Sequence, residues 1–179
     1  MAGRIQILGS ERLVVIKPSG LTVVFGLYII ISASFARQLW ELIQRLIGRH
    51  NAQVAVIVFL AGFAAFSLAS LLKARFNIFK FFIKLAIVAL AFFFSWKQPF
   101  FTEKFHVAEY GLLGWLACRD LNKSKIALKN VVLALLFGSL IGVLDEGFQK
   151  LLPYRVCEIR DMLTNTVSVA FGIILYLAK

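Results

Sequence analysis

Charged residues are scarce in this sequence, and acidic residues are the scarcest of them. Asp, Glu, Lys and Arg make up 16% of the 179 residues, whereas a soluble domain holds about a quarter. Hydrophobic residues make up 60%, in long stretches with few charges. Stretches of that kind are typical of helices that span a bilayer, so the composition excludes a water-soluble globular protein.

Cysteine is nearly absent, which excludes two further classes of protein. The two cysteines, Cys118 and Cys157, fall on opposite sides of the membrane in the topology given below. We therefore expect no disulfide and no framework of disulfides. A zinc site is not expected either, since one nearby histidine without a cysteine cluster is a poor ligand set. The sequence predicts no metal and no cofactor.

The net charge of +11 has the sign that nucleic-acid-binding proteins have, but not their pattern. The basic residues lie in short connections between apolar stretches, and no basic stripe carries interleaved aromatic residues. Nucleic acid is therefore not an expected partner, whereas lipid head groups are. A modest excess of Lys and Arg on one side favours a topology with both termini in the cytoplasm.

Apolar runs predict an all-α fold, a polytopic bundle of about six transmembrane helices in a single domain over residues 1–179. The first run follows a basic segment and ends in small residues, so it also resembles a cleaved signal peptide. We favour a retained helix. The segment Arg37–Gly48 has apolar residues at helical spacing and polar residues opposite, which predicts either an amphipathic helix in the membrane interface or a helix packed on its neighbours. The expected spans are Leu21–Ala36, Ala52–Leu72, Ile78–Trp96, Phe105–Cys118, Ile126–Leu144 and Met162–Leu177.

Three short polar groups lie near the membrane in the second half of the sequence. In the first group, His106 precedes Glu109 by three residues and Tyr110 by four, so these side chains share one face of a helix. In the second, Gln149 follows Asp145 by four residues and is likewise on its side of the helix. The third group lies before and at the start of the sixth expected span and consists of Arg155, Glu158, Arg160, Asp161 and Asn165.

The predicted topology brings the three groups together. The fourth span begins, the fifth ends and the sixth begins on one side of the membrane, which the basic residues identify as extracytoplasmic. Asp161 is four residues before Asn165, and a carboxylate there is also suited to cap the sixth helix. Charges near a bilayer are costly, so such residues pair or serve a function. We therefore expect a polar patch at the outer interface.

These groups also carry a family resemblance. The stretch from Glu103 to Gly114 (EKFHVAEYGLLG) resembles the Lys-His-Tyr motif of VanZ-like proteins, and Asp145 to Gln149 (DEGFQ) resembles their Asp-Glu-x-x-Gln motif. Arg155 followed by Asp161 and Asn165 is similar to their Arg…Asp-x-x-x-Asn ending, although Tyr154 stands where the family commonly has glycine. The resemblance covers about residues 100–179. It implies an envelope membrane protein, in the inner (plasma) membrane of a bacterium. The family takes its name from a protein associated with resistance to the glycopeptide teicoplanin, and the resemblance supplies no reaction.

Each group has a functional and a structural interpretation. His106 is either a proton-transfer group or ligand, or a histidine bonded to a neighbour at the helix start. Asp145 and Glu146 are either an acid–base or cation-binding pair, or partners of Arg155, Arg160 or Lys104. Arg155 either grips a phosphate or carboxylate, or pairs with an acidic side chain. No serine nucleophile occurs in the groups.

The leading hypothesis is a protein that binds, and in one version modifies, an anionic lipid-linked or cell-wall-related ligand. A structural or partner-docking protein is the alternative, with protein partners unidentified. A small transporter is the third option, weakened because no carboxylate or histidine is expected near mid-membrane. The candidate catalytic residues are His106, Glu109, Asp145 and Glu146, and the candidate binding residues are Lys104, Tyr110, Gln149, Arg155, Asp161 and Asn165.

Overall fold

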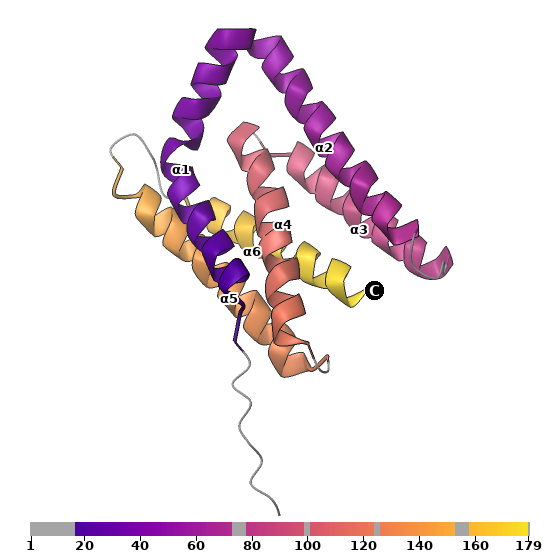
Figure 1. Ribbon diagram of the computed structural model, residues 1–179. Coiled ribbons are helices and arrows are strands. Elements are labelled where there is room, and N and C mark those ends of the chain that lie inside the picture. Colours follow the sequence, from indigo (N-terminus) through magenta and orange to yellow (C-terminus); the bar gives the residue numbers. More distant parts are fainter. Residues whose placement is uncertain (1–16, 73–77, 99–100, 124–125, 153–157, 179) are drawn as a thin grey trace, which may run out of the picture.

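The described residues of this computed structural model form six helices (Figure 1). They comprise residues 17–72, 78–98, 101–123, 126–152 and 158–178, with backbone alone for 59–60, 63–72 and 101–102. The all-α fold is thereby confirmed. The helices are α1 (Gly20–Ile47), α2 (Arg49–Leu72), α3 (Ile78–Trp96), α4 (Phe101–Leu121), α5 (Leu128–Gln149) and α6 (Ile159–Leu177).

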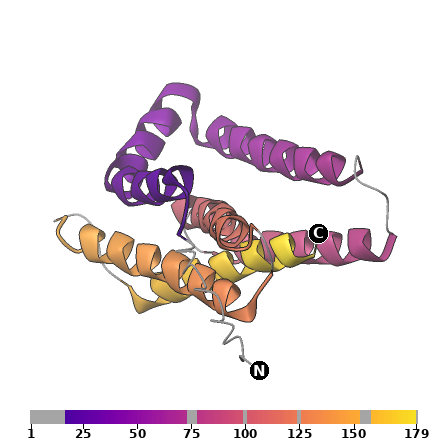
Figure 2. The ribbon, with the colours of Figure 1, turned by 60° about the horizontal axis from the view of Figure 1, so that its bottom comes forward.

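Helices α4, α5 and α6 pack on one another and form the centre of the protein, and α1 lies across α4 and α5. Figure 2 shows α4 nearly end-on, between α1 on one side and α5 and α6 on the other. Helix α2 contacts α1 and α3, and α3 also contacts α4 and α6. The part of the chain that carries the polar motifs is therefore the best packed.

Three of the described helices, α1, α3 and α5, are long and apolar enough to cross a membrane. Most of their large hydrophobic side chains face outward; Phe79 on α3, for example, is 72% exposed. Outward-facing apolar surface of this extent is costly in water and favourable in lipid. Membrane-helix character is thus supported by both composition and packing.

The amphipathic segment Arg37–Gly48 is not a separate helix, since its residues to Ile47 continue α1 without a break. The helix ends where the chain reaches Gly48, whose φ of 84° and ψ of 149° suit glycine alone. The change from apolar to charged residues after Ala36 does not interrupt the helix. It reflects different surroundings of the side chains and not a different backbone conformation. From the turn at Gly48, α1 and α2 diverge, and α2 runs toward α3 (Figure 1).

Glycines let the backbones of α4 and α6 approach closely. A Cβ atom placed on Gly172 would lie 1.7 Å from the carbonyl oxygen of Gly111, and one on Gly114 would lie 2.2 Å from that of Val169. Helix α5 approaches in the same way, since a Cβ on Gly138 would lie 2.7 Å from both Val169 methyl carbons. Small residues at such contacts are the usual means of close helix packing in membranes.

A polar contact ties the start of α1 to the end of α4. The backbone N–H of Ser19 donates to Asp120 Oδ2 at 3.0 Å, and the hydroxyls of Ser19 and Thr22 donate to the same oxygen. Arg119 Nη2 donates to Asp120 Oδ1 at 2.9 Å. Burial alone would raise the pKa of Asp120, but these hydrogen bonds outweigh it and hold that pKa below its usual 3.8.

Candidate functional site

The motif residues of α4 and α5 meet in a buried hydrogen-bonded network. The Tyr110 hydroxyl donates to Asp145 Oδ2 at 2.9 Å, and Gln149 Nε2 donates to Asp145 Oδ1 at 3.2 Å and to Glu146 Oε1 at 3.4 Å. The backbone N–H of Glu158 reaches Glu146 Oε2 at 3.4 Å. Each of the four side chains that form the network is at most 4% exposed. Helix α5 runs on to Gln149, five residues past the expected end of the span, so Asp145, Glu146 and Gln149 all lie on helical backbone.

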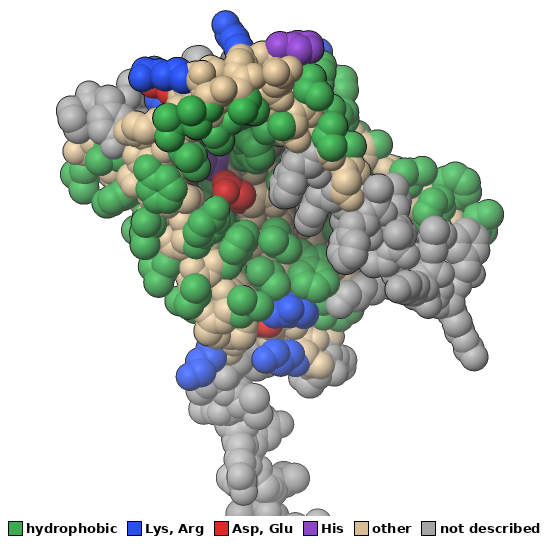
Figure 3. Space-filling model, turned by 45° about the horizontal axis from the view of Figure 1, so that its top comes forward, with side chains coloured by type: hydrophobic (Ala, Val, Ile, Leu, Met, Phe, Trp, Pro, Cys, Tyr) green, Lys and Arg blue, Asp and Glu red, His purple; other side chains and the backbone are tan. Residues whose placement is uncertain are grey.

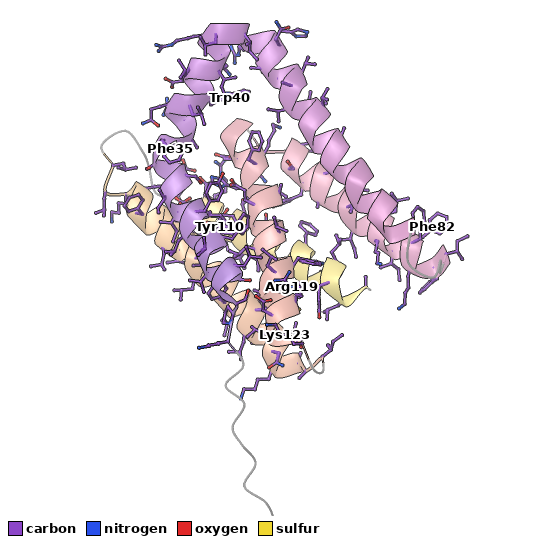
Figure 4. The ribbon with its side chains drawn as sticks, viewed as in Figure 1. Phe35, Trp40, Phe82, Tyr110, Arg119 and Lys123 are labelled. Atoms are coloured by element: carbon purple, nitrogen blue, oxygen red, sulfur yellow. The ribbon has the colours of Figure 1, made fainter. Side chains whose placement is uncertain are left out.

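Asn165 brings α6 to the same place. It is 1% exposed, and a Cβ atom on Gly142 would lie 3.0 Å from its Cβ and 3.6 Å from a ring carbon of Tyr110. Its Nδ2 atom has no hydrogen-bond partner among the described residues. Figure 4 shows Tyr110 in the middle of the bundle, among side chains from several helices. Three helices therefore contribute polar groups to one buried point.

The two buried carboxylates receive hydrogen bonds from neutral donors in the described part of the chain. Arg160, one cation expected to neutralise them, instead binds Glu103 at 3.0 Å, Glu158 at 3.4 Å and Asp161 at 3.3 Å. The carboxylate of Glu103 raises the pKa of Arg160 above its usual value. Lys104, a second candidate, donates to the carbonyl oxygen of Trp96 instead. Arg155, the third, lies outside the described residues. Within the described ranges no Lys or Arg forms an ion pair with either carboxylate, and burying a carboxylate away from an opposite charge is costly.

His106 and Glu109 form a second polar element beside this network. His106 Nδ1 lies 3.3 Å from Glu109 Oε2, as an ion pair whose geometry is not that of an aligned hydrogen bond. The His106 ring centroid is 5.9 Å from that of Tyr110. The spacing of three and four residues thus places these side chains on one face of α4, as the sequence indicates.

This pair lines a hollow of about 210 Å³ between α1, α2 and α4, called here the His106 hollow. Its other walls are mainly apolar and come from α1, where Tyr28, Leu39 and Trp40 contribute. In Figure 3, acidic and histidine side chains gather in a recess below the α1–α2 hairpin, bordered by hydrophobic side chains. Sequence reasoning missed the α1 residues, because they read as lipid-facing or interfacial positions and carry no chemical signature.

Two predicted binding residues lie elsewhere. Lys104 Nζ donates to the carbonyl oxygen of Trp96 at 2.7 Å and does not line the His106 hollow. Asp161 is in the first turn of α6, where a carboxylate still favours the helix dipole, but the residue at the cap position is Glu158. The prediction that Asp161 caps α6 is therefore wrong, because the helix begins three residues earlier than expected.

Comparison with known proteins extends the resemblance seen in the motifs. A family model described as VanZ/LLP1 matches residues 20–179. The match includes the first three helices, which carry none of the motifs. No curated protein and no solved structure matches the chain. The network of α4, α5 and α6 and the hollow that α1 completes thus fall within a single matched region.

Proposed function

Because the chain belongs to the VanZ/LLP1 family, we propose that this membrane protein binds the polar head group of a lipid-linked cell-envelope ligand in the His106 hollow. The observation that carries the proposal is the pairing of His106 with Glu109 on the wall of a recess that is otherwise mainly apolar. A ligand with a polar end and an apolar chain matches that arrangement.

The size of the recess indicates that it holds only part of the ligand. At about 210 Å³ it is smaller than the range of about 300–1,000 Å³ that holds a whole drug-sized ligand. We therefore assign it to one end of a long amphiphile, whose chain continues along outward-facing apolar side chains of α1 such as Leu39 and Leu42. The position of the protein in a bacterial inner membrane, with both termini cytoplasmic, belongs to the same proposal.

The reason to propose an anionic ligand is Arg155. Among the described residues that line the recess, the charged groups are His106 and Glu109, which offset one another when the histidine is protonated. Arg155 stands three residues before Glu158, whose backbone N–H reaches the network. We assign Arg155 to a phosphate or carboxylate of the ligand, since guanidinium groups grip both by two parallel hydrogen bonds. An effect on teicoplanin susceptibility would follow from sequestering such a ligand.

The geometry also separates the four residues predicted to be catalytic. Of these, His106 and Glu109 line the recess, whereas Asp145 and Glu146 are enclosed in the network behind Tyr110. We therefore assign any acid–base step on a bound ligand to the His106–Glu109 pair. Asp145 would act through Tyr110, as a positioning residue.

The test is native mass spectrometry of the purified full chain, with identification of the lipids that remain bound. Ala36→Leu places a larger side chain in the recess, and Ala55→Leu makes the same change at an exposed position of α2 as the matched control. We expect a defined envelope lipid on the wild type and on the control, and at least tenfold less on Ala36→Leu and Glu109→Gln. Equal lipid content in all four proteins would contradict the proposal.

A structural role is the second candidate, and the buried network favours it. Four polar side chains at most 4% exposed can lock α4 to α5 without touching any ligand. In that case Asp145→Asn would lower the stability of the folded protein while the bound lipids of the folded fraction stay unchanged. A ligand-binding network would instead lose the lipid in a protein that remains folded.

A further inference from the structure

A second hollow lies beside the first, and Val56 lines both. It has a volume of about 220 Å³ and is formed where α2 faces the end of α3 and the start of α4. Its walls are mainly apolar, with polar groups contributed by α2 and α4. The residues that line it include Gln53, Val56, Ile57, Phe92, Trp96 and Lys104.

Lys104 is held at this hollow by three contacts. Its Nζ atom donates to the carbonyl oxygen of Trp96 at 2.7 Å and lies 5.2 Å from the centroid of the Trp96 ring. Its own carbonyl oxygen accepts a hydrogen bond from the Ser95 hydroxyl at 3.1 Å, which fixes the backbone of α4 against α3. These contacts hold the ammonium group of Lys104 in one position at the hollow.

Among the described residues, the ammonium group of Lys104 contacts neutral partners only. No carboxylate there lies within ion-pair distance of its Nζ, and the nearby Glu103 is paired with Arg160. An ammonium group has three donors, of which one is used by Trp96. Lys104 stands directly before the expected span that begins at Phe105, at the level of the lipid head groups, so an anionic head group is a suitable partner for its remaining donors.

We propose that this second hollow binds an anionic phospholipid, with the phosphate on Lys104 and Gln53 and the acyl chain along Val56, Ile57 and Phe92. Basic pockets between membrane helices are suited to phosphate-bearing head groups. The volume holds one head group and the first part of a chain rather than a complete ligand. The site goes beyond the proposed function because it uses neither His106 nor Glu109.

The test uses the full chain in detergent, titrated with phosphatidylglycerol or phosphatidylcholine and followed by native mass spectrometry. Lys104→Gln removes the charge, and Lys97→Gln is the matched control. Lys97 Nζ also lies 5.2 Å from an aromatic ring, that of Phe93, but Lys97 lines neither hollow. We expect the wild type and Lys97→Gln to prefer phosphatidylglycerol, and Lys104→Gln to bind it about tenfold more weakly.

Further variants keep the outcome interpretable if Lys104→Gln is poorly folded. Lys104→Arg should restore the preference for phosphatidylglycerol, and Ile57→Trp, which fills the apolar wall, should abolish it with the charge intact. Glu109→Gln should leave it unchanged, which separates this site from the His106 hollow. Equal losses in Lys97→Gln and Lys104→Gln, or no preference in the wild type, would overturn the proposal, because lipid would then be held by general surface charge.

Discussion

A single methyl group at Gly172 should separate α4 from α6. In Gly172→Ala the new Cβ would lie 1.7 Å from the carbonyl oxygen of Gly111, whereas ordinary contact begins at about 3.4 Å. The neighbouring atoms are backbone, which cannot rotate away, so the helices must move apart by about 1.7 Å. A gap of 0.5–1 Å already forfeits a quarter to a half of a van der Waals contact. We expect a cost of about 3 kcal/mol, the upper end of the range for overpacked cores.

The assay is unfolding of the purified protein in mixed micelles as the SDS fraction is raised, followed by tryptophan fluorescence. Gly147→Ala on α5 is the matched control, since that glycine is exposed and a Cβ there meets no atom within 4 Å. Alanine in an exposed helix is favoured over glycine by up to about 1 kcal/mol, so the control should be neutral or more stable. The reasoning fails if Gly172→Ala unfolds within about 0.5 kcal/mol of the wild type.

Three further predictions concern polar and turn residues. Tyr110→Phe leaves Asp145 Oδ2 without its donor and should cost about 1–3 kcal/mol in the same assay; no loss would mean that the hydrogen bond is absent. Asp120→Asn should cost about 1.5–3 kcal/mol near neutral pH. Because the pKa of Asp120 is lower in the folded than in the unfolded protein, this difference should shrink as the pH falls below about 4, and a constant difference would refute it. Gly48→Ala forces a side chain into a backbone conformation that costs about 1–3 kcal/mol, so its thermal midpoint should fall whereas that of Gly147→Ala should not.

Hydropathy and spacing predicted the helices and the faces of their polar side chains. The positions of Gln149 relative to Asp145, and of Glu109 relative to His106, follow from helical geometry alone. The contact between Tyr110 and Asp145 joins two helices, and the order of the spans indicated only that both lie toward one side. Which helices touch depends on the shapes of their surfaces, and here glycines such as Gly142 decide that.

The first half of the chain was the harder to interpret. Trp40 and Ser32 line the His106 hollow, yet their neighbours in sequence carry no motif. Asp120 was overlooked because it follows Arg119 just past the expected end of a span, where a charge needs no explanation. Its partners, Ser19 and Thr22, are about a hundred residues away in the chain, and no local pattern connects them.

The length of α1 has a consequence for how the concentration of a ligand is expressed. At 1.5 Å per residue its 28 residues span about 42 Å, more than the roughly 30 Å of a bilayer's hydrocarbon core. A helix of this length that crosses the bilayer must tilt or extend into the head-group layer. The lipid-linked ligand that we propose for the His106 hollow would reach it by diffusion in the plane of the membrane. Occupancy follows its mole fraction in the membrane, so added detergent dilutes the ligand even when the volume of the sample is constant.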